Sequence, residues 1–233
     1  MGSICSTLRD YGHSVSDYRS FFLTAELDTY IQAHAPEVDH VQKSLIKATQ
    51  AFGNWARMQI APDQAAFLAT LVAATRPQFA IEVGTFTGFS SLSIARALPE
   101  GGKLLCCDTS EEWTQVAQQH WRLANVSDRI ELVIGPAIDT LRNLPDHQSV
   151  DFAFLDADKS NYFAYYEELV PRLSAHGVIV IDNVLWSGRV LDSSTKDCDT
   201  TALREINEYI LSDDRVTSVL LSIGDGVNLV RLA

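Results

Sequence analysis

Residues 150–159 read VDFAFLDADK, and residues 178–183 read VIVIDN. Each stretch opens as a short apolar run, which is typical of a strand buried on both faces of a parallel sheet, and closes in polar residues. The segment between them, from Tyr162 to Leu173, has the length of a helix and is followed by Gly177. The pattern therefore predicts a strand–helix–strand unit within an α/β fold.

Polar side chains stand at the ends of both predicted strands. In such a unit the carboxyl ends of the strands open onto one crevice, where open α/β sheets bind ligands. Asp156, Asp182 and Asn183 would bring two carboxylates and an amide oxygen to it, a donor set that suits Mg²⁺ or Ca²⁺, and Lys159 is a candidate acid or base. A lone aspartate after a strand also serves as a helix cap, and an Asp-Asn pair as a turn. Their combination at two neighbouring strand ends favours a metal site.

Composition limits the classes of protein to consider. A chain of 233 residues, 46% of them hydrophobic, can fill the core of one α/β domain. Its net charge of −12 argues against a nucleic-acid partner, which requires a basic face. No segment reaches the roughly 18 apolar residues of a membrane span, and the polar start, Met1 to Arg19, lacks the apolar centre of a signal peptide. We therefore expect a soluble, cytoplasmic protein with no membrane partner.

Neither the cysteines nor the histidines show the spacing of a zinc or redox site. Cys106 and Cys107 are adjacent on a predicted strand, so their side chains should lie on opposite faces of the sheet as small core residues. Unpaired cysteines of this kind are typical of a reducing compartment.

Strands and helices alternate from residue 79 onward. Before them, the segment from Ser16 to Ala74 has helix-like apolar spacing, with Pro62 in the first turn of one helix. Gly224-Asp225-Gly226 indicates a tight hairpin near the end of the chain. We predict a single domain, residues 1–233, with an N-terminal helical cap (1–74) and a mostly parallel sheet core (75–233). The predicted strands are 79–83, 103–107, 130–134, 150–155, 178–181, 216–222 and 227–231, and the core helices are 89–98, 111–124, 137–144, 162–173 and 201–211.

The turn after the first predicted strand indicates the kind of ligand. Residues 81–90 read IEVGTFTGFS, so two glycines allow the backbone to approach a ligand just before a helix. Phe86 stands where a dinucleotide-binding turn has its second glycine, which disfavours a pyrophosphate, and Glu82 suits a cationic group. Asp108, at the end of the next strand, can hydrogen-bond both hydroxyls of a ribose, and Ala137 is small enough to lie against an adenine. S-adenosylmethionine fits a nucleoside pocket of this kind.

Four motifs together resemble those of the metal-dependent O-methyltransferases, the group of caffeoyl-CoA O-methyltransferase and catechol O-methyltransferase. They are IEVGTFTGFS at 81–90, DADKxNY at 156–162, DNVLWxG at 182–188 and GDG at 224–226, and the similarity runs from about Met58 to the C-terminus. The resemblance implies a Rossmann-like class I methyltransferase sheet of seven strands, mostly parallel, with a C-terminal antiparallel hairpin and N-terminal helices. It also implies S-adenosylmethionine as the methyl donor, a divalent cation, and a vicinal aromatic diol of the catechol, caffeoyl or flavonoid type as the acceptor.

Carried over position by position, the resemblance assigns a role to each site residue. Asp156, Asp182 and Asn183 would ligate the metal. Asp156 would also be a catalytic residue that faces both metal and donor, and Lys159 would be the catalytic base. Plant relatives often carry Thr at the position of Ile60, which alters one donor contact. The implied donor contacts are Ile60, Glu82, Gly84, Thr85, Ser90, Asp108, Ala137 and Asp158.

The implied reaction needs help to form its nucleophile, because a free phenol has a pKa of about 10. A cation chelated by both oxygens would stabilise the phenolate and orient it, and Lys159 would accept the proton. Alternatively, Lys159 only neutralises the acidic cluster. Trp186 and Tyr162 are candidates for a wall of the acceptor pocket, or they are core residues. The pattern in 190–200 resembles no plant loop, so a CoA thioester as acceptor stays open.

Two other classes of protein stay open from the sequence. A nucleotide-dependent reductase is disfavoured by Phe86, and a non-catalytic binding protein of the same fold is disfavoured because Lys159 accompanies the whole ligand set. The apolar residues Phe21, Phe22, Phe52 and Trp55 precede the sheet core, and relatives are commonly dimeric. We therefore expect a homodimer, the alternative being that these residues cover their own domain.

Overall fold

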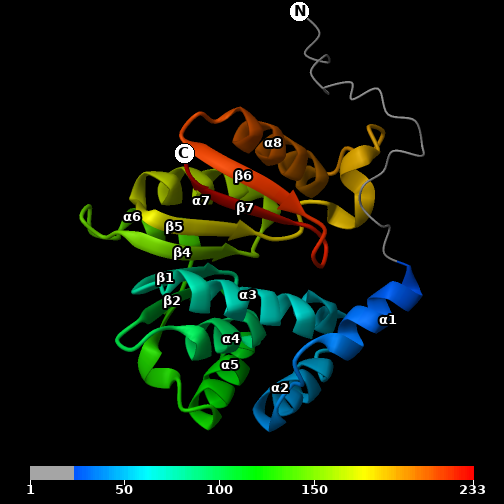
Figure 1. Cartoon of the computed structure of the whole chain (residues 1–233), viewed down its shortest axis with the longest axis vertical. Coiled ribbons are helices and arrows are strands. Elements are labelled where there is room, and N and C mark those ends of the chain that lie inside the picture. The colour runs from blue at the N-terminus through cyan, green and yellow to red at the C-terminus, as the bar shows by residue number, and fades with distance from the viewer. Residues whose placement is uncertain (1–23) are drawn as a thin grey trace, which may run out of the picture. The chain divides into compact units, whose positions relative to one another are not determined.

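The computed structural model describes residues 24–233, apart from the side chains of Ala25 and Asp28, and confirms the predicted α/β fold. A seven-stranded sheet has the order β3-β2-β1-β4-β5-β7-β6 (Figure 1). Neighbouring strands from β3 to β5 are parallel, whereas β7 is antiparallel to both β5 and β6. The strands are β1 Phe79–Val83, β2 Lys103–Asp108, β3 Ile130–Ile134, β4 Val150–Leu155, β5 Leu173–Ile181, β6 Val216–Leu221 and β7 Val227–Leu232.

The order of strands reverses between β1 and β4, because the chain continues from β1 to β2 on one side and reaches β4 on the other. Such a switch point leaves a crevice at the carboxyl ends of the two central strands. The hairpin predicted at 224–226 joins β6 to β7, and Gly224 and Gly226 both have positive φ, as tight turns require.

Helices cover both faces of this sheet (Figure 1). Helices α2 to α5 pack on one face and α6 to α8 on the other, and each layer encloses its own cluster of buried side chains. Cys106 belongs to the first cluster and Cys107 to the second, as the strand alternation predicts. The helices are α2 His40–Gln50, α3 Pro62–Thr75, α4 Phe89–Ala97, α5 Glu111–Leu123, α6 Ala137–Arg142, α7 Tyr162–Leu169 and α8 Cys198–Ser212, and the 3₁₀ turns are η2 Gly53–Met58, η3 Ser127–Arg129, η4 Lys159–Asn161, η5 Val170–Arg172 and η6 Trp186–Leu191.

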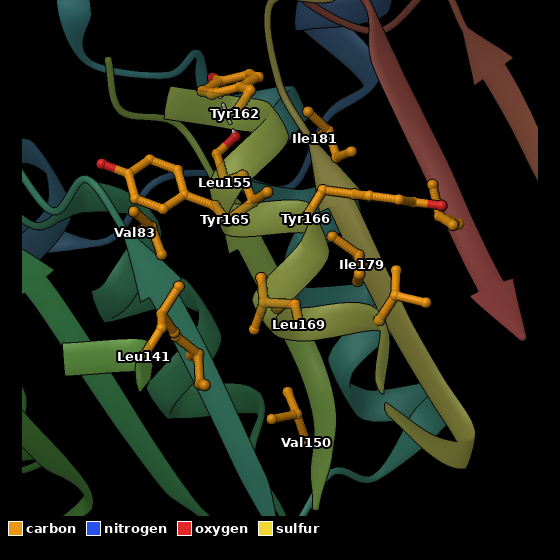
Figure 2. Packing of buried hydrophobic residues seen from close by; sticks show 14 of the residues in the cluster. Val83, Leu141, Val150, Leu155, Tyr162, Tyr165, Tyr166, Leu169, Ile179 and Ile181 are labelled. Carbon is orange, nitrogen blue, oxygen red and sulfur yellow. Dashed lines mark hydrogen bonds between the residues drawn. The ribbon is translucent and has the colours of Figure 1, made fainter. Parts of the chain in front are cut away.

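Three tyrosines of α7 form the centre of the second cluster (Figure 2). Tyr162, Tyr165 and Tyr166 are almost fully buried, and burial of side chains of this size contributes on the order of 2 kcal/mol each. A buried tyrosine also needs a partner for its hydroxyl. The Tyr165 hydroxyl donates to Asp158 Oδ1 at 2.7 Å and that of Tyr166 to Asp213 Oδ2 at 2.9 Å. The core packing therefore fixes polar groups at its edge, including one predicted site residue.

Three predicted boundaries are wrong for identifiable reasons. The helix expected over 162–173 ends at Leu169, because Pro171 has no N–H, and the chain continues as η5. Strand β5 then begins at Leu173 rather than at 178, since Leu173 pairs with Val150 although several of the residues that follow are polar or exposed. Helix α8 begins at Cys198 rather than at 201, because Asp197 caps it: its Oδ1 accepts a hydrogen bond from Thr200 N at 3.0 Å.

The chain divides into two compact units, Met1–Ala35 and Pro36–Ala233. The sheet and helices α2 to α8 all belong to the second unit, whereas helix α1, Ala25–His34, belongs to the first and is capped by Thr24. The earlier part of the predicted helical segment, with Phe21 and Phe22, lies outside the described residues. Within the part of the chain that the structure describes, no helix is long and apolar enough to cross a membrane.

Candidate active site

Backbone hydrogen bonds continue the parallel ladder one residue beyond the central strands. Asp156 N donates to Val83 O at 2.8 Å, and Asp182 N donates to Leu155 O at 2.9 Å. The residues that follow β1, β4 and β5 therefore lie side by side at the switch point. The structure thus brings together the predicted metal ligands and the turn 84–88, which is predicted to bind the methyl donor and is called the donor turn below.

Asp182 is buried beside a second carboxylate. Its side chain is 1% exposed, and Oδ1 accepts a hydrogen bond from Asn183 N at 2.7 Å. Burial, reinforced by the negative charge of Asp156, raises the pKa of Asp182 to about 7. Asn183 has a φ of 59°, a left-handed conformation that asparagine tolerates better than most residues. The cluster thus concentrates oxygen atoms and negative charge where little water can screen it.

Lys159 lies inside this cluster and not on the surface. Its side chain is 8% exposed, and Nζ donates to Asp156 Oδ1 at 3.2 Å, to Tyr162 Oη at 2.7 Å and to Asn183 Oδ1 at 2.5 Å. These contacts use all three N–H groups of an ammonium. The ring of Trp186 lies 5.7 Å from Nζ. Tyr162 is fully buried, so it is a core residue that accepts a hydrogen bond from Lys159 and is not a wall of the acceptor pocket.

The oxygen atoms that converge in this cluster are of the kind that bind a hard divalent cation. The predicted ligands are two carboxylates and an amide oxygen, the atoms that Mg²⁺ and Ca²⁺ prefer. A lysine ammonium already contacts two of the three, Asp156 and Asn183, so these oxygens converge on a positive charge. Residues 24–233 contain no group of three His, Cys, Asp or Glu arranged for a metal, and the predicted set includes only two such residues.

The donor half of the crevice holds a buried acid without a full set of partners. Glu82 is fully buried, and neither its Oε1 nor Thr85 Oγ1 has a hydrogen-bond partner among the described residues. Burial raises the pKa of Glu82 to about 8; the neighbouring side chains of Ser90, Thr85 and Cys106 oppose this rise, and the charge of Asp156 adds to it. Ser90 is also buried. Unpartnered buried oxygens of this kind suit a ligand that brings a positive charge and hydrogen-bond donors.

Gly84 brings the turn after β1 against the end of β4, where Asp156 lies. Its φ is +92°, and a Cβ at this position would lie 2.1 Å from the backbone oxygen of Asp156. Any side chain would therefore separate the two strand ends, so only glycine permits this approach.

Asp108 shapes the turn from the next strand. Its Oδ2 accepts hydrogen bonds from Thr85 N at 2.9 Å and Phe86 N at 2.7 Å, and Oδ1 accepts one from Ser110 N at 2.8 Å. A carboxylate offers about four lone-pair directions, so roughly one is left for a ligand. Asp108 therefore has a structural part in addition to the ribose contact that the sequence predicts. Phe86, at a φ of 50°, packs edge-on against Trp113 at 5.0 Å.

The other predicted donor contacts lie on neighbouring elements. Ile60 is buried just before α3, and Ala137 is buried at the start of α6, directly after the turn that follows β3. The carboxylate of Asp158 is exposed and accepts hydrogen bonds from Tyr165 and Asn161. No contact here tests these three assignments, which stay predictions.

Sequence reasoning missed Gln64 on α3. This side chain is 3% exposed, lies where a Cβ on Gly224 would meet its Oε1 at 2.5 Å, and lowers the pKa of Asp182. A signal was available, since Gln64 precedes the buried Leu68 and Val72 by one and two helical repeats and is thus a polar residue on an apolar stripe.

Comparison with known proteins agrees with this site. A family model described as O-methyltransferase matches residues 32–233. The probable caffeoyl-CoA O-methyltransferase 2 of Dictyostelium discoideum is 38% identical over 205 residues, covering 86% of this chain and 89% of that protein. The flavonoid 3',5'-methyltransferase of Vitis vinifera is 33% identical over 231 residues, covering 94% and 98%. The crystal structure of the O-methyltransferase from Bacillus cereus in complex with SAH has a TM-score of 0.82 at 28% identity, covering 89% of this chain and 97% of that one.

The fold and the paired half-sites define a class I methyltransferase that uses S-adenosylmethionine. The chain belongs to the O-methyltransferase family, and its relatives are of the caffeoyl-CoA O-methyltransferase type. It is therefore an S-adenosylmethionine-dependent O-methyltransferase, and both the reductase and the non-catalytic binding protein are excluded at the level of class.

Proposed function

We propose that this enzyme methylates one hydroxyl of a vicinal aromatic diol that is held by a divalent cation, Mg²⁺ or Ca²⁺. The observation that carries the proposal is the convergence of Asp156 and Asn183 on the ammonium of Lys159, beside the buried Asp182. The proposal is supported by the names of two relatives, a caffeoyl-CoA O-methyltransferase and a flavonoid methyltransferase.

In this proposal Asp156, Asp182 and Asn183 hold the ion. When bound, the ion supplies a Lewis acid that favours the phenolate form of the diol and orients both of its oxygens. When the ion brings its positive charge to the oxygens that Lys159 contacts, the ammonium can release its own proton to water, and as a neutral amine Lys159 then accepts the proton of the reacting hydroxyl. Tyr162 keeps Nζ at the edge of the cluster through its 2.7 Å hydrogen bond, so the amine stays within reach of the acceptor.

The donor half holds S-adenosylmethionine, whose sulfonium supplies the methyl group. Glu82 and Thr85 provide buried oxygens for its cationic end, and Asp108 offers its remaining lone pair to the ribose. Ile60, Ser90, Ala137 and Asp158 complete the set of donor contacts. Because Gly84 touches the backbone of Asp156, the two half-sites fix donor and acceptor in one geometry, and such positioning is worth roughly 7–11 kcal/mol of the barrier.

The proposal extends to the organisation of the protein. We propose one methyltransferase domain, a homodimer and a cytoplasmic location, with no membrane or nucleic-acid partner. Trp55 is 56% exposed and lies 6.0 Å from Trp113, so an aromatic surface is available to a second copy. Light scattering at micromolar concentration should give twice the mass of the chain, and a monomeric mass would exclude the dimer.

A matched pair of acceptors tests the reaction. Catechol should be methylated in the presence of Mg²⁺, whereas phenol, which lacks one of the two oxygens, should be nearly inert, with the deficit chiefly in kcat/KM. EDTA should abolish turnover of catechol and excess Mg²⁺ should restore it. Equal turnover of phenol, or full activity in EDTA, would exclude a cation that chelates a diol.

A further inference from the structure

The segment Trp186–Thr195, which we call the acceptor loop, begins three residues after Asn183. Its start has an unusual backbone, because Trp186, Ser187 and Gly188 have successive φ values of 48°, 52° and 79°. Left-handed conformations of residues other than glycine cost of the order of 1 kcal/mol each. Such a run persists only where the surrounding structure holds it.

A single guanidinium on α8 holds most of this loop. Arg204 Nε donates to Val190 O at 2.9 Å, Nη1 to Thr195 O at 2.8 Å, and Nη2 to Arg189 O at 2.8 Å and also to Asp192 O. All of these acceptors are backbone carbonyls within one loop. The fixed fork of an arginine side chain can satisfy diverging carbonyls at once, whereas the single ammonium of lysine cannot.

The first residue of the acceptor loop lies beside the candidate catalytic lysine. Trp186 packs against the buried cluster beneath α8, and its ring lies 5.7 Å from Lys159 Nζ. Ser187 N donates to Asp225 Oδ1 in the hairpin at 2.5 Å. Helix α8 also reaches the chain just before the loop, where Asn207 Nδ2 donates to Val184 O at 2.9 Å. The loop is therefore attached on both sides of Trp186. Beyond it, Arg204 binds four backbone carbonyls between residues 189 and 195, and the Asp192 side chain accepts hydrogen bonds from Ser194 and Thr195.

We propose that Arg204 is a positioning residue that holds the acceptor loop as a wall of the acceptor pocket. This inference rests on the proposed function, since it assigns the loop to the diol and not to the methyl donor. Arg204 touches no reacting group, so its loss should act through the loop. The donor turn joins β1 to α4, which packs on the opposite face of the sheet from α8, and should be unaffected.

The test compares Arg204→Lys and Arg204→Gln with a matched control, Arg129→Gln. Arg129 makes the same kind of contact, from Nη1 to Ala95 O at 3.3 Å and Leu98 O at 3.1 Å, but at the end of α4. Arg204→Gln should raise the KM for catechol roughly tenfold, with a smaller change in kcat and an unchanged dissociation constant for S-adenosylmethionine by calorimetry. Arg204→Lys should be intermediate, and Arg129→Gln should leave the KM for catechol at the wild-type value.

Hydrogen exchange provides a readout that does not depend on activity. Amides 187–195 should exchange faster in Arg204→Lys than in the wild type, while those of β1 and β4 keep their protection. Wild-type KM and wild-type exchange in Arg204→Lys would overturn the inference, as would a donor affinity that falls in parallel with the acceptor affinity. If Arg204→Gln does not fold, Arg204→Lys decides. If the wild type does not methylate catechol, the proposed function fails, and the exchange data still show whether Arg204 holds the loop.

Discussion

The donor half and the acceptor half of the site meet at the carboxyl ends of the central strands, but different kinds of contact hold them in place. In the donor half, Asp108 accepts hydrogen bonds from three backbone N–H groups, so main-chain geometry fixes the turn. In the acceptor half, side chains make the decisive contacts, from Lys159 to its oxygen partners and from Arg204 to the acceptor loop. The donor half should therefore tolerate changes of charge in the acceptor half, whereas the acceptor half should depend on each of its charged side chains.

The largest effect should follow from a change at Asp182. Asp182→Asn keeps the shape but removes a buried negative charge that the proposed cation would require, so turnover of catechol should fall by about 10³-fold or more. Calorimetry should still detect S-adenosylmethionine, because the donor turn is held by Asp108. Asp128→Asn, which removes an exposed charge in η3 away from the site, is the matched control. Loss of donor binding in Asp182→Asn would contradict the independence of the two halves.

Replacement of Lys159 should have the next largest effect. Lys159→Ala should slow turnover by roughly 10²–10⁴-fold, as for loss of a general base, with partial recovery at high pH. Binding of donor and diol should change much less. A wild-type rate at pH 7 would show that the lysine is only a counter-charge, and the acceptor half would then depend on its carboxylates alone.

Asp108 tests the donor half. Asp108→Ala should weaken the binding of S-adenosylmethionine by about 1–3 kcal/mol. The variant loses a hydrogen bond to a charged group and the carboxylate that holds the turn. Asp108→Asn should have a smaller effect, because an amide oxygen still accepts some of the backbone hydrogen bonds. The KM for catechol should not change when donor is saturating. An unchanged donor affinity in Asp108→Ala would mean that the turn and the ribose are both held by other groups.

Glu82 tests a different property, the dependence of folding stability on pH. Its pKa is raised from an unfolded value near 4.5 to about 8, so between these values the native state binds more protons than the unfolded state. The stabilising contribution of its neutral form is complete at low pH and is lost as the pH rises toward 8, by up to about 1.4 kcal/mol per pH unit. Urea unfolding of the donor-free protein should show this loss. Glu82→Gln should make the slope shallower and leave the share that comes from Asp182, whose pKa is raised to about 7. Glu205→Gln, on the exposed surface of α8, should leave the slope as in the wild type.

The features set by the main chain could be predicted from the sequence, whereas the contacts made by side chains could not. Strands β1, β3 and β4 have the predicted limits, because their apolar runs are bounded by polar residues, glycine or proline. The meeting of Gly84 with Asp156 follows from parallel strands that end together. The burial of Lys159 could not be read from its polar neighbours, and the four carbonyl contacts of Arg204 leave no pattern in the sequence, because any residue supplies a carbonyl. The roles of the individual site residues stay predictions until variants are measured.

The contact at Gly84 has a consequence for the evolution of the enzyme. Because a Cβ at this position would lie 2.1 Å from Asp156 O, the spacing between the two half-sites is set by main chain against main chain. Side chains around the acceptor can be exchanged without altering that spacing. The distance over which the methyl group is transferred thus depends on the main chain of the sheet. The loops around the acceptor can change, and with them the acceptor that the enzyme uses, without changing that distance.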